Sequence, residues 1–214
     1  MKLLPKDLLI KTGEIDQAQW NFSPFFGRLQ RQRFRMAERL LNGRKFKQLL
    51  EVGYGSGIFL PQLATHAEQL SGIDVHDRSV EVQKSLERVG VRAELHSGSA
   101  TNLPFPDTAF DAMVSISALE FVEPIEQAVA ELARVCQANA VLIVICPARS
   151  SMLDKALWLT TGGNAEKFYG TRRETLLPAL QTRFTVRRQL SYPPLLSACG
   201  LAVYHAWELS PHHR

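Results

Sequence analysis

The chain has 214 residues, of which 45% are hydrophobic and 21% are charged, and its formal net charge is +4. This composition excludes a disordered chain and favours one globular domain with a sizeable core. Three cysteines without a C-x-x-C pair indicate neither a disulfide framework nor a metal site, and no apolar stretch reaches the length of a membrane span. We therefore expect a cytoplasmic protein without a bound metal.

The first 46 residues are expected to form a helical extension. Apolar residues recur at helical spacing from Phe26 to Leu41, and Asn42-Gly43 ends that helix. Basic residues gather in the same segment, at positions 28, 31, 33, 35, 39, 44, 45 and 47. Such a group is either a solvated helix face or a surface for anionic lipid or nucleic acid.

Strands and helices alternate across the next segment, the predicted core at residues 47–147. The predicted strands are Gln48–Val52, Gln69–Val75, Val91–His96, Phe110–Ile116 and Ala140–Cys146. The predicted helices are Ile58–His66, Arg78–Arg88 and a third from Pro124 to about Cys136. This alternation predicts right-handed crossovers and a doubly wound parallel sheet.

The last segment, residues 148–214, departs from this alternation. Its predicted elements are a helix over Thr171–Thr182 and two strands, Phe184–Leu190 and Leu201–Leu209. The strand pair would give the sheet an antiparallel C-terminal strand, so we expect an α/β, Rossmann-like, mostly parallel sheet of seven strands. Ser151–Gly170 follows the carboxyl end of a strand and is expected to overhang a ligand crevice. We assign the whole chain, 1–214, to one domain.

The stretch LLEVGYGSGIFL, Leu49 to Leu60, places three glycines at alternate positions after an apolar strand. In an open α/β sheet, ligands bind beyond the carboxyl ends of the strands, where this loop lies. Its spacing matches neither the dinucleotide fingerprint nor a P-loop, because Ile58 and Phe59 stand where those motifs need other residues. Asp74 ends the next strand, where a carboxylate can accept both hydroxyls of a ribose. The alternative for Asp74 is a helix N-cap or a surface turn.

In order and spacing, these segments resemble the motifs of class I S-adenosylmethionine-dependent methyltransferases. The resemblance rests on Glu51–Gly57 (EVGYGSG), Gly72–Val75 (GIDV), His96–Asp111 (HSGSATNLPFPDTAFD), Ala118–Val122 (ALEFV) and Glu131–Val135 (ELARV). It implies S-adenosylmethionine as the cofactor and methyl transfer as the reaction. The most similar subgroup is methyltransferase type 11, which includes ubiquinone and menaquinone methyltransferases. That subgroup methylates many unrelated small molecules, so the resemblance does not name the acceptor.

The resemblance also implies which residues hold the cofactor. The glycines would let the backbone lie against the cofactor, the following helix would receive its carboxylate, and Asp74 would bind its ribose. Glu51 would orient the loop or bind the amino group, and Val75 would pack on the adenine. The implied set is Glu51, Gly53, Tyr54, Gly55, Gly57, Asp74, Val75, Gly98, Ser99, Ala100 and Ser115. Two positions depart from the family: Ser99 replaces a usual acid, which predicts weaker binding, and Phe121 replaces a frequent histidine.

A catalytic base is required only if the acceptor loses a proton. The candidates are Glu120, His96, His76 and Tyr169, each of which also has a structural alternative such as an ion pair or a helix cap. Acceptor contacts are expected from two aromatic segments, Trp20–Phe26 and Ser151–Gly170, which would either form a lid or pack the flanking helices.

The predicted function is therefore methyl transfer to a small-molecule acceptor, lipid or quinone-like. Nucleic acid is not an expected partner, because Ser115–Ala118 stands where many methyltransferases of nucleic bases carry NPPY or DPPY. Peripheral membrane contact is compatible with the basic N-terminal segment, and no pattern indicates an oligomeric state. The alternatives are a methyltransferase of RNA or protein and a non-catalytic, cofactor-binding partner or regulatory subunit. A dehydrogenase is disfavoured by the glycine spacing.

Overall fold

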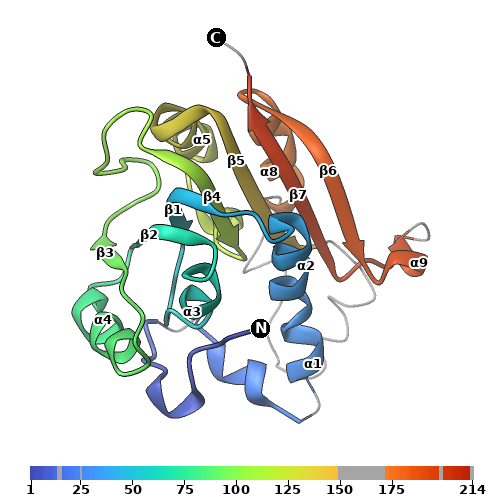
Figure 1. Cartoon of the computed structure of the whole chain (residues 1–214). Helices are drawn as coiled ribbons and strands as arrows, with labels where there is room; N and C mark the ends of the chain where they lie inside the picture. The colour runs from blue at the N-terminus through green and yellow to red at the C-terminus, as the bar shows by residue number, and fades with distance from the viewer. Residues whose placement is uncertain (14–15, 25, 149–171, 198–199, 213–214) are drawn as a thin grey trace.

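The computed structural model describes residues 1–13, 16–24, 26–148, 172–197 and 200–212. In this described chain, seven strands form one sheet with helices on both of its faces (Figure 1). The strands are β1 (Phe46–Val52), β2 (Ala67–Asp74), β3 (Glu94–Ser97), β4 (Phe110–Ile116), β5 (Cys136–Pro147), β6 (Phe184–Tyr192) and β7 (Tyr204–Pro211).

The strand order is β3-β2-β1-β4-β5-β7-β6. Neighbouring strands are parallel from β3 to β5, whereas β7 runs antiparallel to both β5 and β6. This confirms the predicted Rossmann-like, mostly parallel, seven-stranded sheet with an antiparallel C-terminal strand. The order reverses between β1 and β4, and sheets of this kind bind ligands beyond the carboxyl ends of the strands at such a reversal.

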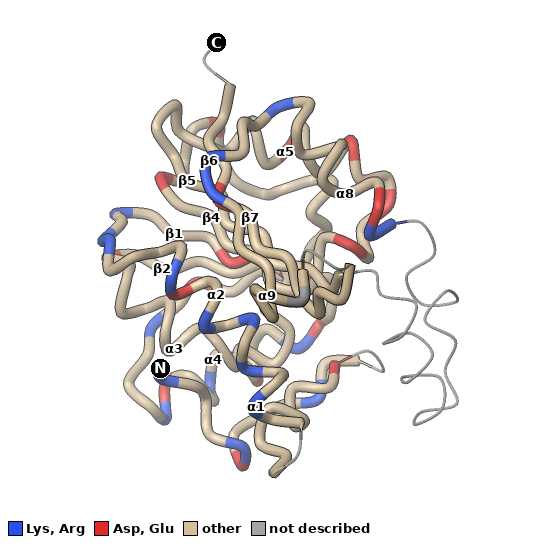
Figure 2. The backbone as a smooth tube through the Cα atoms, turned by 90° about the vertical axis from the view of Figure 1, so that its right-hand side faces the viewer, with Lys and Arg blue, Asp and Glu red and all other residues tan. Residues whose placement is uncertain are grey.

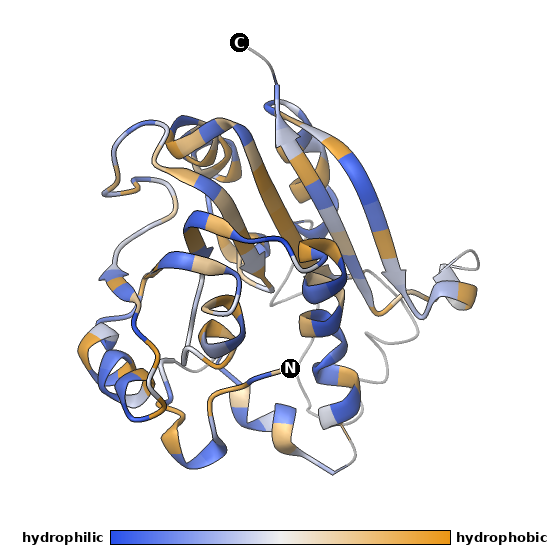
Figure 3. Cartoon of the chain, in the orientation of Figure 1, coloured by the Kyte–Doolittle hydropathy of each residue, from blue (hydrophilic) through white to orange (hydrophobic). Residues whose placement is uncertain are grey.

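The sheet separates the hydrophobic core into two layers, each covered by helices. One face carries α2 (Gln32–Leu41), α3 (Leu60–Leu63) and α4 (Ser79–Glu87), and the other carries α5 (Ile125–Val135) and α8 (Arg172–Gln181). Successive residues of β5, Ile143 and Val144, belong to the two different clusters because side chains of a strand alternate between its faces. Figure 3 accordingly shows β5 as hydrophobic along most of its length, whereas the edge strand β6 includes a hydrophilic stretch.

The N-terminal segment, residues 1–46, contains several short helices. Two 3₁₀ helices, η1 (Lys6–Leu8) and η2 (Ala18–Phe22), precede α1 (Gly27–Gln30) and α2. The single helix expected over Phe26–Leu41 is thus divided at Arg31. Asn42 ends α2 in the left-handed conformation, as its position before Gly43 predicted. Figure 2 shows basic residues recurring along α1 and α2.

Several predicted boundaries were wrong, and pairing explains the clearest case. The helix expected over Ile58–His66 is reduced to α3, because the Phe46 N–H donates to the His66 carbonyl at 2.8 Å and draws the chain into β2. Strand β5 begins four residues early, at Cys136, which pairs with Phe110. Strands β3 and β7 each begin three residues later than expected, and a short helix, α9 (Pro194–Ser197), lies in the connection before β7. None of the helices in the described part of the chain has the length and hydrophobicity needed to span a bilayer.

Candidate functional site

The three glycines of the loop after β1 adopt positive φ angles: +82° at Gly53, +50° at Gly55 and +72° at Gly57. A Cβ atom on Gly53 would lie 2.1 Å from the Ala118 Cβ, and one on Gly57 would lie 2.7 Å from a methyl carbon of Val82. A Cβ on Gly55 would instead meet only Thr12 Oγ1, at 3.9 Å. Two of the glycines are therefore required by the protein's own packing, and Gly55 alone among the three faces open space.

Asp74, at the end of β2, holds this loop. Its Oδ2 accepts a hydrogen bond from the Gly55 N–H at 2.8 Å, and no donor among the described residues reaches Oδ1. Asp74 does not cap the following helix, because the N-cap of α4 is Arg78. The geometry leaves Oδ1 as an acceptor beside the open backbone of Gly55.

His76 also braces the loop. Its Nε2 lies 3.0 Å from the Gly55 carbonyl, and its Nδ1 accepts the Arg78 N–H at 3.1 Å. In these contacts Nε2 acts as the donor and Nδ1 as the acceptor. Both ring nitrogens are therefore engaged within the protein, which leaves His76 poorly placed as a catalytic base.

Tyr54 is buried and joins the loop to β2 and β3. A Cβ on Gly72 would lie 2.9 Å from Tyr54 Cδ1, and the Tyr54 hydroxyl donates to the His96 carbonyl at 3.5 Å. Burial, with a smaller effect from Asp74, raises the pKa of the Tyr54 hydroxyl, which stays protonated. The side chain of Val75, just beyond β2, is 78% exposed and available for stacking.

The segment after β3 is organised by its own hydrogen bonds. The Gly98 N–H donates to the Asp74 carbonyl at 2.8 Å. The Ser99 hydroxyl lies 2.7 Å from Thr101 Oγ1 and also accepts the Thr101 N–H, while Ala100 is buried. The structure therefore brings residues 98–100 next to the end of β2, with the Ser99 hydroxyl already engaged.

Buried polar atoms without a hydrogen-bond partner gather at the carboxyl ends of β1 and β4. They are Glu51 Oε2, Ser56 Oγ, Ser115 Oγ, Ser117 Oγ and both carboxylate oxygens of Glu120. An unpaired buried polar group costs about 1–3 kcal/mol, so such a concentration indicates a place where a ligand completes the bonding.

The site has two sides. The β1–β3 side consists of the loop after β1 and the ends of β2 and β3. The β4–β7 side consists of the end of β4, η3 (Leu119–Phe121), the end of β5 and the start of β7.

The two buried carboxyl groups have raised pKa values. Burial, then the neighbouring Asp74 charge, raises the pKa of Glu51, and Arg33 opposes this. Burial raises the pKa of Glu120 to about 7, against the lowering effects of its own backbone N–H, Arg33 and Arg173. The Arg33 guanidinium thus acts on both carboxyl groups.

Arg33 and Tyr204 were not predicted as site residues. Arg33 comes from α2, outside the family motifs, and the sequence placed it in a general basic group. A usable signal was its spacing, four residues before Ala37 and seven before Leu40, on the apolar stripe of the helix. Tyr204 is the first residue of β7 and is buried, and its pKa is affected by the charges of both Arg33 and Glu120. No sequence pattern distinguishes it.

His96, a further candidate base, lies on β3, where its carbonyl accepts the Tyr54 hydroxyl. The ring of His96 packs edge-on against Phe105, and its Nε2 is 3.2 Å from Glu94 Oε1 but outside hydrogen-bonding geometry. Tyr169 and the segment Ser151–Gly170 lie outside the described residues.

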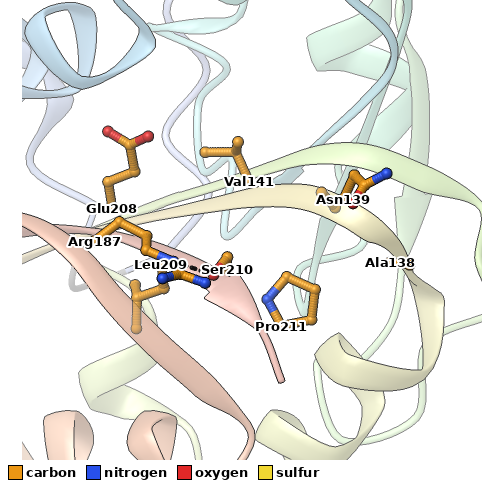
Figure 4. A pocket seen from close by; sticks show the side chains of 9 residues that line it. Ala138, Asn139, Val141, Arg187, Glu208, Leu209, Ser210 and Pro211 are labelled. Carbon is orange, nitrogen blue, oxygen red and sulfur yellow. Dashed lines mark hydrogen bonds between the residues drawn. The ribbon is translucent and has the colours of Figure 1, made fainter. Parts of the chain in front are cut away.

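A hollow of about 260 Å³ lies at the amino end of β5, opposite the glycine loop, and contains none of the predicted site residues (Figure 4).

Comparison with known proteins finds a family model that matches part of this chain. A family model described as "Methyltransferase domain" matches residues 50–144. Phosphatidylethanolamine N-methyltransferase of Cereibacter sphaeroides is 34% identical over 101 residues, which are 46% of this chain and 49% of that relative. The chain therefore spans about half the length of this curated relative.

Solved structures share the fold. A SAM dependent methyltransferase from Aquifex aeolicus superposes with a TM-score of 0.67 at 17% identity, covering 92% of this chain and 100% of that chain. The N-methyltransferase NodS from Bradyrhizobium japonicum WM9, in complex with S-adenosyl-l-homocysteine, gives a TM-score of 0.66 at 17% identity, covering 92% and 94%. Residues 50–144 therefore match a methyltransferase domain, and the described chain shares the fold of solved S-adenosylmethionine-dependent methyltransferases.

Proposed function

We propose that this chain binds S-adenosylmethionine and transfers its methyl group to a small-molecule acceptor of lipid or quinone-like character. The observation that carries the proposal is the group of unpaired, buried polar atoms beside the glycine loop, at the reversal of strand order. In a methyltransferase domain, a ligand at this position is expected to be the methyl donor.

The residues at hand fit that cofactor. Asp74 Oδ1 is available to a ribose hydroxyl, the exposed Val75 side chain to the adenine, and the unpaired Glu51 Oε2 to the amino group. When bound, S-adenosylmethionine supplies an electrophilic methyl group on a positively charged sulfur. The protein's contribution is to bind, to orient and to exclude water, which accounts for much of the rate of such a displacement.

A lipid acceptor is supported by the surface of the N-terminal extension. Trp20 and Phe26 stack with ring centroids 6.3 Å apart, yet remain 37% and 55% exposed. They adjoin the basic helices α1 and α2, and exposed aromatic rings beside arginines suit a bilayer surface. The relative from Cereibacter sphaeroides is itself named for a phospholipid. Within this proposal, residues 1–46 and 148–214 supply the acceptor side, and a cytoplasmic location remains a prediction.

The first test is calorimetric titration of the full chain with S-adenosylhomocysteine, with NAD as the control ligand. We expect micromolar binding that Asp74→Asn weakens at least tenfold. The amide oxygen of the asparagine can still accept the Gly55 N–H, but the charged carboxylate oxygen proposed to accept the ribose hydroxyl is lost. Asp77→Asn, an exposed neighbour in the same connection, should bind as the unaltered protein does. Absence of heat from the folded protein would contradict the enzyme proposal and favour a non-catalytic subunit.

The acceptor is tested separately, with S-adenosylmethionine carrying an isotopic methyl label. Phosphatidylethanolamine vesicles and a short-chain hydroquinone in detergent are the two probes. Label in the phospholipid supports the lipid acceptor, and label in the hydroquinone supports the quinone-like one. Label in neither, from protein that binds S-adenosylhomocysteine, would exclude both acceptor classes as represented by these probes.

A further inference from the structure

Glu120 is the most anomalous polar residue of the β4–β7 side. It follows β4 directly, on η3, and is 1% exposed. Apart from the N–H of its own backbone, which lowers its pKa, neither carboxylate oxygen has a hydrogen-bond partner among the described residues. Buried carboxylates in proteins are normally paired, so this residue needs an explanation beyond packing.

The same short segment contacts the glycine loop. Ala118, two residues before Glu120, occupies the space that a Cβ on Gly53 would need. Arg33 influences both Glu51 on β1 and Glu120 on η3. Glu120 therefore stands beside the end of β1 where the methyl donor is proposed to bind, and on the side that faces β5 and β7.

Each element packed around Glu120 contributes a titratable or charged group. These groups are Arg33 from α2, Arg173 from α8, Cys146 from β5 and Tyr204 from β7. Arg173 Nη1 donates to the Ala148 carbonyl at 3.0 Å. Burial raises the pKa values of both Cys146 and Tyr204, so these two groups stay neutral near pH 7. Among the described residues, the charges that act on Glu120 are then Arg33 and Arg173.

We propose that Glu120 receives the proton of the methyl acceptor, and that the acceptor therefore carries an N–H or O–H on its nucleophilic atom. The inference rests on the proposed function. The acceptor's lone pair takes the methyl group, the electron pair of the broken carbon–sulfur bond stays on sulfur, and the acceptor's proton passes to a carboxylate oxygen of Glu120. The positive charge of the donor, brought next to Glu120, favours the ionised carboxylate that this role requires.

The experiment compares two ligands that differ by one methyl group and one positive charge. S-adenosylmethionine and S-adenosylhomocysteine are titrated into the full chain at pH 7, each in two buffers of different ionisation enthalpy, which gives the number of protons released. Because the pKa of Glu120 is about 7, roughly half of it is protonated in the free protein. We expect S-adenosylmethionine to release up to about half a proton more than S-adenosylhomocysteine.

The difference should vanish in Glu120→Gln and persist in Glu123→Gln, a carboxylate three residues later whose side chain is 65% exposed. It should also vanish in the unaltered protein at pH 9, where Glu120 is already ionised, so the test does not depend on the variant's folding. An equal difference in Glu120→Gln, or one that persists at pH 9, would overturn the role of Glu120. Absence of binding by either ligand would instead overturn the proposed function, and the inference with it.

Discussion

The two sides of the site differ in how their polar groups are satisfied. On the β1–β3 side, the protein bonds to itself: Asp74 and His76 hold the two polar groups of Gly55, and Gly98 is tied to β2. On the β4–β7 side, Ser115, Ser117 and Glu120 are buried with unpaired oxygens. The backbone of the glycine loop is thus held in place before any ligand arrives, although Glu51 Oε2 and Ser56 Oγ stay unpaired beside it. The β4–β7 side leaves more oxygens unpaired, including both of the Glu120 carboxylate, at a cost in stability.

The largest effect is expected at Gly53, on the β1–β3 side. Gly53→Ala puts a Cβ at φ +82° and 2.1 Å from the Ala118 Cβ, so we expect a loss of about 4 kcal/mol in the free energy of unfolding. Gly43→Ala, at φ +69° with open space around it, is the matched control and should lose only about 1 kcal/mol from backbone strain. Urea denaturation measures both, and equal losses would show that the contact with Ala118 is unimportant.

The second prediction concerns how the buried carboxyl group of Glu120, on the β4–β7 side, affects the free energy of unfolding. Because burial raises the pKa of Glu120 to about 7, the folded protein holds a proton that the unfolded chain releases near pH 4.5. The stability that this proton contributes is present below pH 4.5 and lost as the pH rises to about 7. Glu120→Gln should remove this dependence and be more stable than the unaltered protein at pH 8, by on the order of 3 kcal/mol.

Denaturation at pH 4.5, 6 and 8 tests this prediction, with Glu123→Gln as the exposed control. If the two stability curves for Glu120→Gln and the unaltered protein stayed parallel across this range, the pKa of Glu120 would be the same in the folded and the unfolded protein. Burial would then impose no cost on the ionised carboxylate.

A smaller effect is expected at Arg134 of α5, which contacts the segment that follows β3. Its guanidinium pairs with Glu131 at 2.7 Å and donates to the carbonyls of Leu103 and Phe105. Arg134→Ala should cost about 2 kcal/mol, discounted because the side chain is 29% exposed. Arg78→Ala, whose 3.9 Å pair with Glu81 is exposed, should change stability by less than about 0.5 kcal/mol. Similar losses for both variants, measured in urea, would mean that the carbonyl contacts contribute nothing.

Prediction from the sequence succeeded where spacing along the chain carries the information. The alternation of strands and helices predicted the sheet, and the apolar run Ala140–Cys146 marked a strand covered on both faces. The short interval from the glycine loop to the end of the next strand placed Asp74 beside Gly55. The ends of helices and strands were less predictable. They depend on contacts between distant segments, such as the hydrogen bond from the Phe46 N–H to the His66 carbonyl.

The role of the glycines was only partly foreseeable. All three glycines adopt positive φ angles. The reason expected for them was contact with a ligand. The structure gives a different reason for Gly53 and Gly57, whose missing side chains make room for Ala118 and Val82. These contacts join segments far apart in the chain, so no local pattern contains them.

The sequence by itself therefore determined the fold class, the glycine loop after the first strand and the position of Asp74 beside it, because each depends on short intervals within one βαβ unit. Only the tertiary structure decided the composition of the β4–β7 side. Arg33 from the N-terminal extension, Glu120 from the segment after β4 and Tyr204 from the last strand meet there across more than 170 residues of chain. The raised pKa values of Glu120 and Tyr204 follow chiefly from burial, which arises only when the sheet has formed and α2 has packed on it.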